Sequence, residues 1–220
     1  MKPVQIYLVA YNAVQVLGWA YILWTTITIL AANGSNQDVY DGIKCCLQIF
    51  QTAAILEIIH CAVGVVRSPV STTIIQVYSR VFVTWAILYS VPSTQSSIGL
   101  SMLAIAWSVT EVVRYSFYAL SLVKSVPYAL TWMRYTFFYV LYPLGASGEL
   151  FTLVAALPEI DAKKIFTLEM PNSINFAFSY WWFIVVTCLI YIPGFPKMYF
   201  YMFGQRRKVL GHKPTSKKTN

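Results

Sequence analysis

Six long apolar runs divide this chain, and they constrain its fold more than any other feature. Runs of roughly 18 or more apolar residues are long enough to cross a bilayer as helices. Of the 220 residues 58% are hydrophobic and 11% are charged, whereas a soluble domain carries about 25% charged residues. The sequence therefore predicts an all-α polytopic membrane protein, a bundle of six transmembrane helices. The expected spans are residues 6–30, 46–66, 73–91, 98–123, 129–157 and 174–192.

The connections between these runs are short, so residues 1–220 are expected to form a single six-span membrane domain. Outside the spans, the lysines and arginines are concentrated on one side of this domain. With the N-terminus in the cytosol, the segments facing the opposite side hold only Lys44, Lys163 and Lys164. This asymmetry follows the positive-inside rule and predicts that both termini are cytosolic. The expected cytosolic cations are Lys2, Arg67, Lys124, Lys197, Arg206, Arg207, Lys208, Lys213, Lys217 and Lys218.

Residues 204–220 are expected to form a basic cytosolic tail that ends Lys217-Lys218-Thr219-Asn220. That ending fits the dilysine pattern, an address read by transport receptors. It favours the endoplasmic reticulum membrane. The net charge of +8 is spread over separate loops and this tail, which argues against a nucleic-acid partner.

A phenol and a carboxyl group occupy the fifth expected span. Tyr142 and Glu149 are seven residues apart, about 700° of helical rotation, so they share a helix face with Cα atoms about 10 Å apart. A carboxylate in hydrocarbon is costly and is usually kept for a function. Two interpretations stay open: a catalytic pair, or a structural hydrogen bond between helices.

Further ionisable residues lie in or beside the expected spans. Because lipid expels isolated charges, they are expected to point inward and pair. They are interpreted either as polar ties between helices or as arginines that hold anionic groups such as the phosphates of a coenzyme. The set is Glu57, His60, Arg80, Glu111, Arg114 and Arg134.

The segment His60-Cys61 through Arg67-Ser68 matches the signature of tyrosine phosphatases. That chemistry requires a thiolate at a helix N-terminus and a loop of amides around a phosphate. Here the segment ends an apolar run, so phosphatase catalysis is rejected. The four cysteines show no metal-ligand spacing or disulfide framework.

Six short strings, in order along the chain, resemble the very-long-chain (3R)-3-hydroxyacyl-CoA dehydratase family. That family was first called protein-tyrosine-phosphatase-like, and its plant pasticcino-type members are especially similar. The strings are Tyr11-Asn12 with Gly18-Trp19, Leu56-Glu57-Ile58-Ile59-His60, Gln76-Val77-Tyr78-Ser79-Arg80, Glu111-Val112-Val113-Arg114-Tyr115, Arg134-Tyr135, and Tyr142-Pro143-Leu144-Gly145 followed by Glu149.

The resemblance implies a lyase of the endoplasmic reticulum that acts third in the fatty-acid elongation cycle. It would remove water from a long-chain 3-hydroxyacyl-CoA to give the trans-2-enoyl-CoA. Its partners would be the condensing enzyme, the ketoacyl-CoA reductase and the enoyl-CoA reductase. Carried over by motif, Tyr142 and Glu149 are the catalytic pair. The other positions that match family-typical residues are Glu57, Arg80, Glu111, Arg114, Arg134 and Gly145.

Dehydration needs a base for the C2 proton and an acid for the departing C3 hydroxyl, and two groups on one helix face can supply both. The sequence leaves open which of Tyr142 and Glu149 is which. No cofactor or metal is expected, because eliminating water involves no redox step. Three alternatives remain: a small transporter, a non-catalytic phosphatase-like binding protein, and a scaffold for the other elongation enzymes.

Overall fold

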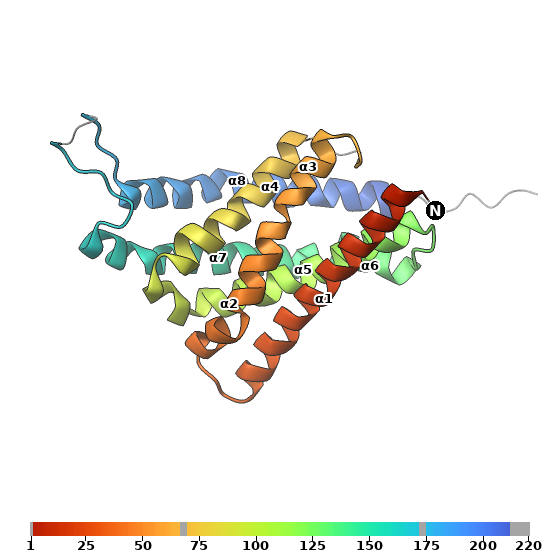
Figure 1. Ribbon diagram of the computed structural model, residues 1–220, viewed down its shortest axis with the longest axis horizontal. Coiled ribbons are helices and arrows are strands. Elements are labelled where there is room, and N and C mark those ends of the chain that lie inside the picture. The colour runs from red at the N-terminus through yellow and green to blue at the C-terminus, as the bar shows by residue number, and fades with distance from the viewer. Residues whose placement is uncertain (1, 67–69, 172–174, 212–220) are drawn as a thin grey trace, which may run out of the picture.

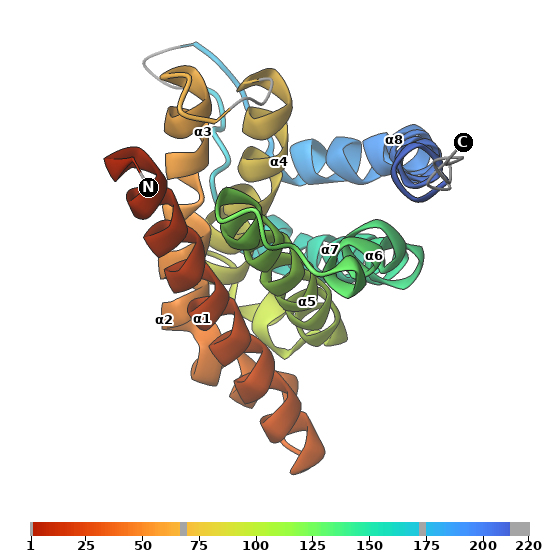
Figure 2. The same ribbon diagram turned by 90° about the vertical axis from the view of Figure 1, so that its right-hand side faces the viewer.

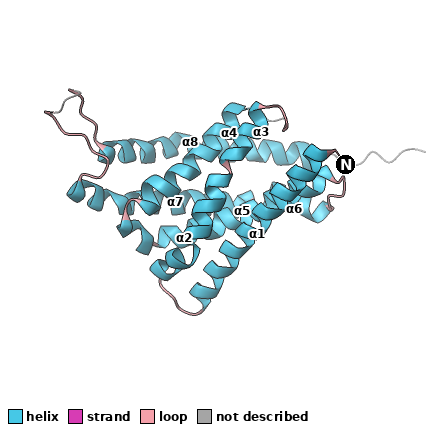
Figure 3. Cartoon of the chain, viewed as in Figure 1, coloured by secondary structure: helices cyan, strands magenta, loops and turns pink. Residues whose placement is uncertain are grey.

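Helices account for nearly all of the computed structural model, which describes residues 2–66, 70–171 and 175–211 (Figures 1 and 3). Within these ranges a single isolated bridge, between Leu168 and Phe178, is the one extended pairing. The elements are α1 (Pro3–Ala31), α2 (Asn36–Ala53), α3 (Ile55–Ala62), α4 (Val70–Phe82), the π-helical segment η1 (Val83–Tyr89), the short 3₁₀ helix η2 (Pro92–Ser96), α5 (Ile98–Leu122), α6 (Tyr128–Thr136), α7 (Phe138–Lys163) and α8 (Tyr180–Leu210).

Five helical stretches in the described part of the chain are long and apolar enough to cross a membrane. They are Pro3–Ala31, Asn36–Ala62, Ile98–Leu122, Phe138–Lys163 and Tyr180–Leu210. This confirms the all-α membrane class. The predicted span 73–91 is not among the five, because the α-helix ends at Phe82 and π-helical turns continue to Tyr89.

Several predicted boundaries move. The second apolar run is preceded by ten further helical residues, so α2 begins at Asn36, where Ser35 caps it by accepting from the Asp38 amide. The sixth predicted span begins too early, since its helix starts at Tyr180 and continues to Leu210. Residues 204–210, predicted as tail, are the last turns of this helix, and the dilysine ending lies outside the described residues.

The fifth predicted span is broken in two at Phe137, between α6 and α7. Pro143 lies within α7, which is continuous across it. A proline cannot donate a hydrogen bond to the carbonyl four residues earlier. That carbonyl, on Tyr139, instead accepts from the Tyr199 hydroxyl of α8 at 3.3 Å. The proline thus leaves an acceptor that ties α7 to α8.

The connections gather at two ends of the bundle. At one end the Asn36 amide donates to the Ser96 carbonyl (3.1 Å), and the Ser93 backbone amide donates to Glu159 (2.7 Å). At the other end Leu8, Val66 and Leu122 line one cavity, which brings together the start of α1 and the ends of α3 and α5. The segment α4–η1 therefore runs from one end of the bundle to the other.

Helix α5 is the centre of the bundle. It lies between the α1–α2 pair and α7, with α8 on the outer side (Figure 2). In its most apolar stretch 56% of residues are buried, against 6% for α8. The outward faces of the bundle carry large apolar side chains such as Leu17, Trp24, Val140 and Ile192, as expected where a surface meets lipid.

Helices α5 and α7 approach closely because glycines face each other. A Cβ atom on Gly148 would lie 2.7 Å from the Leu103 backbone nitrogen and 2.9 Å from the Gly99 carbonyl oxygen. Gly145 is less crowded, with a built Cβ 3.4 Å from that of Ala106. The small residues Gly145 and Gly148 of α7 thus pack against α5, as small-residue faces do in membranes.

We expect Gly148→Ala to lower the free energy of unfolding by about 1–3 kcal/mol, because the clash is with backbone that cannot rotate away. Thermal unfolding of the purified protein in detergent measures the change. Gly204→Ala in α8 is the matched control, since nothing lies within 4 Å of its built Cβ. Equal melting temperatures for the two variants would contradict the proposed close approach.

Candidate active site

Glu149 lies half-buried in α7, where side chains from two other helices bind its carboxylate. The Trp107 indole nitrogen of α5 donates to Oε1 at 3.0 Å. The Tyr191 hydroxyl of α8 donates to Oε2. The carboxylate therefore joins α5, α7 and α8. Trp107 reaches it because the neighbouring Gly148 allows the two backbones to approach closely.

Tyr142 lies on the same helix but has different neighbours. Its ring stacks on two rings of α8, Phe195 at a centroid distance of 5.0 Å and Tyr199 at 5.9 Å. Among the described residues no hydrogen bond joins its hydroxyl to Glu149 or to another group. A structural Tyr142–Glu149 hydrogen bond is therefore not what the structure contains, since Tyr191 bonds the carboxylate instead.

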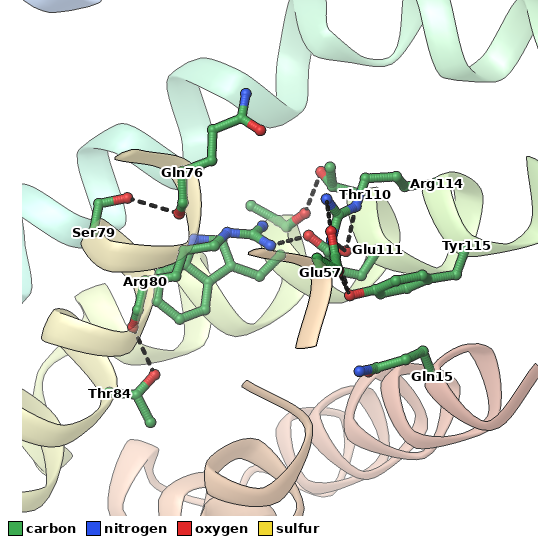
Figure 4. Close-up of polar contacts among 12 residues, drawn as sticks. Gln15, Glu57, Gln76, Ser79, Arg80, Thr84, Thr110, Glu111, Arg114 and Tyr115 are labelled. Atoms are coloured by element: carbon green, nitrogen blue, oxygen red, sulfur yellow. Dashed lines mark hydrogen bonds and ion pairs between the residues drawn. The ribbon is translucent and has the colours of Figure 1, made fainter. Parts of the chain in front are cut away.

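Four of the predicted intramembrane charges form one ion-pair network (Figure 4). Arg114 of α5 donates through Nη1 and Nη2 to both oxygens of Glu57 in α3, at 3.1 and 2.9 Å. Its Nε donates to Glu111 at 2.7 Å. Arg80 of α4 donates to the other Glu111 oxygen, and the Tyr115 hydroxyl donates to Glu57.

Two carboxylates and two guanidiniums cancel within this network. The Glu111 side chain is only 2% exposed, so the pairing offsets what would otherwise be a large desolvation cost. Glu57, Arg80, Glu111 and Arg114 pair with one another across helices, as the interpretation as polar ties predicts. The network joins α3, α4 and α5.

The network also reaches towards Glu149. The Arg80 guanidinium lies over the Trp107 ring, 5.2 Å from its centroid. The same indole donates to Glu149. Arg80, which neutralises Glu111, thus also holds the Trp107 ring that orients the Glu149 carboxylate.

The remaining predicted residues lie apart from the network. The His60 ring is hydrogen-bonded to the Tyr7 hydroxyl at 2.9 Å and packs edge-on against Tyr11. Arg134 of α6 stacks over Phe117 and Tyr118 and donates to the Tyr118 hydroxyl at 3.2 Å. Gly145 faces α5 as a packing residue.

A cavity of about 270 Å³ lies beside the network, between α1, α3, α4 and α5. Its polar lining includes Glu57, His60 and Arg114, and its outer residues include Val66 and Leu122 at the end of the bundle. Within the described ranges, no group of three or more His, Cys, Asp or Glu could hold a metal ion.

Cys61 is buried in the last turn of α3, next to the Thr73 hydroxyl at 3.6 Å. The end of a helix presents carbonyls, whereas a phosphate needs the amides of a helix start. The placement supports the rejection of phosphatase catalysis. Arg67 and Ser68 of the same signature lie outside the described residues.

Sequence reasoning missed Trp107 and Tyr191. One weak signal pointed to Trp107, which precedes Glu111 by four residues and so shares its helix face. Nothing distinguishes Tyr191 among the 16 tyrosines of the chain, since its role depends on how α8 packs against α7.

Comparison with known proteins places the chain in a family. Residues 51–212 match the family described as protein tyrosine phosphatase-like protein, PTPLA. The very-long-chain (3R)-3-hydroxyacyl-CoA dehydratase hpo-8 of Caenorhabditis elegans is 57% identical over 94% of this chain and 96% of its own length. The human very-long-chain (3R)-3-hydroxyacyl-CoA dehydratase 2 is 46% identical over 96% of this chain and 84% of its own.

The plant relative PASTICCINO 2 of Arabidopsis thaliana, also named a very-long-chain (3R)-3-hydroxyacyl-CoA dehydratase, is 44% identical over 94% of this chain and 93% of its own. No solved structure matches the chain. The chain belongs to the protein tyrosine phosphatase-like family, and the resemblance stated from its motifs is confirmed.

We expect Glu111→Gln to lower the free energy of unfolding by about 3–5 kcal/mol, because it leaves Arg80 and Arg114 without their shared carboxylate. Chemical or thermal unfolding in detergent measures this. Asp41→Asn is the control: it removes a carboxylate from the exposed Lys44 pair, and we expect no measurable change. Similar losses in both variants would show that the network does not stabilise the bundle.

Proposed function

We propose that this protein is a very-long-chain (3R)-3-hydroxyacyl-CoA dehydratase, a hydro-lyase that forms the trans-2-enoyl-CoA. Three relatives that align over most of their length carry that name. The observation that carries the proposal is the state of Glu149. Glu57 and Glu111 are neutralised by arginines, whereas Glu149 is held by two neutral donors.

Among the described residues no ion pair engages Glu149, and a carboxylate that is not ion-paired is suited to proton transfer. The Trp107 indole can only donate, so Oε1 of Glu149 acts as an acceptor. In its ionised form this carboxylate can take a proton from carbon. We therefore assign Glu149 as the base, a choice that the sequence alone leaves open.

Tyr142 is proposed as the acid. Its hydroxyl is free of hydrogen bonds to the described residues, so it can donate to a substrate oxygen. The two Cα atoms are about 10 Å apart along α7, and both side chains are long. We propose that a short substrate fragment bridges their functional groups.

The reaction balances with these two groups. Glu149 takes the proton from C2, the C2=C3 double bond forms, and the C3–O bond breaks. The leaving oxygen receives the proton of Tyr142 and departs as water. Return of the proton from Glu149 to Tyr142 restores the enzyme. General acid–base catalysis of this kind contributes about 10²–10⁴-fold.

The arginines of the network are better suited to support than to binding coenzyme phosphates. The donors of Arg114 are directed to Glu57, Glu111 and Tyr115. The 270 Å³ cavity beside them lies at the end of the bundle that is expected to face the cytosol. We propose that the pantetheine arm of the substrate enters there, past His60 and Glu57.

The membrane arrangement is proposed as six spans with both termini cytosolic, in the endoplasmic reticulum. Five candidate spans support it, and α4–η1, which runs from end to end of the bundle, is the sixth. The condensing enzyme and the two reductases of the elongation cycle are proposed partners, on the strength of the family resemblance.

Purified protein in detergent is expected to dehydrate a long-chain (3R)-3-hydroxyacyl-CoA. Tyr142→Phe and Glu149→Gln should each lower kcat by at least about 10²-fold, because each removes one of the two proton-transfer groups. Product is quantified by mass spectrometry, and folding is checked by thermal unfolding. Tyr201→Phe and Asp161→Asn, both at exposed positions, are the controls. Absence of turnover by folded wild type would refute the proposed function, and turnover that survives both substitutions would refute the site.

Trp107→Phe and Tyr191→Phe are expected to lower kcat about 10- to 100-fold with little change in KM. Each removes one hydrogen bond to Glu149 and keeps an aromatic ring in place, and loss of orientation acts on the chemical step. Steady-state kinetics of each variant test this. A variant that raises KM and leaves kcat unchanged would show that the donor serves binding and does not orient Glu149.

A further inference from the structure

A second cavity, here called the outer pocket, lies between α4, η1, α7 and α8 and encloses about 110 Å³. Its walls include Phe82 at the end of α4, Leu153 of α7, and Phe183, Thr187 and Tyr191 of α8. The two-proton chemistry described above does not require this cavity.

The outer pocket begins beside the proposed catalytic carboxylate. Tyr191 lines it and also donates to Glu149. Leu153 follows Glu149 by four residues, so the two side chains lie on one face of α7. One end of the outer pocket is therefore about one helical turn from the carboxylate.

The outer pocket suits an apolar occupant. The hydroxyls of Ser79 and Thr187 in its wall are already bonded to carbonyls of their own helices, at 3.1 and 2.8 Å. The remaining lining is aliphatic or aromatic, and it excludes a phosphate or a charged group on desolvation grounds.

The other end of the outer pocket reaches the outer surface of the bundle. Tyr78 of α4, which lines it, is 61% exposed, and Phe183 of α8 is 37% exposed. Both residues lie on outward helix faces that also carry other apolar side chains. In a membrane protein such faces contact the hydrocarbon of the bilayer.

We infer that the outer pocket binds the acyl chain of the substrate immediately beyond the reacting carbons, and that the rest of the chain leaves between α4 and α8 into the bilayer. The inference rests on the proposed dehydratase function. A cavity of about 150 Å³ accommodates benzene, so the outer pocket has space for about four carbon atoms. Tyr191 then separates the carboxylate from the apolar chain.

Filling the outer pocket tests the inference. Thr187→Leu and Thr187→Phe place apolar bulk in it, and Thr187→Val is the isosteric control that removes the hydroxyl alone. Val186→Phe adds the same ring at the adjacent, exposed position. Each variant is assayed in liposomes with (3R)-3-hydroxyhexadecanoyl-CoA and with (3R)-3-hydroxybutyryl-CoA, whose chain ends before the outer pocket.

Thr187→Phe is expected to lower kcat/KM for the long substrate about tenfold or more, the effect of displacing about two methylene groups. The short substrate should change less than about twofold, and Thr187→Leu should lie between Val and Phe. Equal losses for both substrates, or the same selectivity in Val186→Phe, would overturn the inference.

Thermal unfolding identifies any variant that fails to fold. If Thr187→Phe does not fold, the smaller substitution Thr187→Leu decides the result.

The dehydratase function and the acyl-chain site are refuted by different results. If wild type turns over neither substrate, the proposed function is refuted. If wild type is active and both Thr187→Leu and Thr187→Phe keep its chain-length dependence, only the acyl site is refuted.

Discussion

The pairing of charge inside an apolar bundle is the constraint on which the rest of this structure depends. Hydrocarbon does not solvate ions, so each buried charge needs a partner within the protein. Arg114 supplies three donors to two carboxylates, on α3 and on its own helix. Arg80 completes the network from α4. Arg80, the charged residue that interrupts the apolar sequence of α4, is thus also the group that binds α4 to α5.

The need to pair buried charge also distinguishes Glu149 from Glu57 and Glu111, whose carboxylates are paired with arginines. A carboxylate that is saturated by arginine is stable and poorly suited to accept a proton. Glu149 receives hydrogen bonds from an indole and a phenol instead, which hold its orientation without neutralising it. The arginine network contacts this site through the face of Trp107, and the charge of Arg80 also acts on Glu149. The Trp107 ring thus contacts both the Arg80 guanidinium and the proposed reactive carboxylate.

Close packing of α5 against α7 makes this arrangement possible. Gly148 lies directly before Glu149, and its missing side chain lets the α5 backbone come near enough for Trp107 to reach the carboxylate. Larger residues there would push the helices apart and break the contact. On the other side, Pro143 frees a carbonyl that α8 binds through Tyr199. Gly148 and Pro143 of α7 thus position the neighbouring helices α5 and α8 around the site.

The sequence by itself determined the helical membrane class, the ranges of the first and fourth expected spans, and the family. A long apolar run is compatible with little other than a membrane-spanning helix. Six short motifs that occur in the same order along the chain are specific for one family. It also indicated six ionisable residues that should point inward and pair. Four of them form the ion network, whereas His60 and Arg134 bond to tyrosines instead. Only the tertiary structure decided which arginine binds which carboxylate, that Tyr191 and not Tyr142 bonds Glu149, and that helices break at Phe137 and begin at Tyr180. The physical reason is that a membrane helix is apolar on its lipid face as well as its packed face. Its sequence pattern therefore does not reveal which side meets which neighbour.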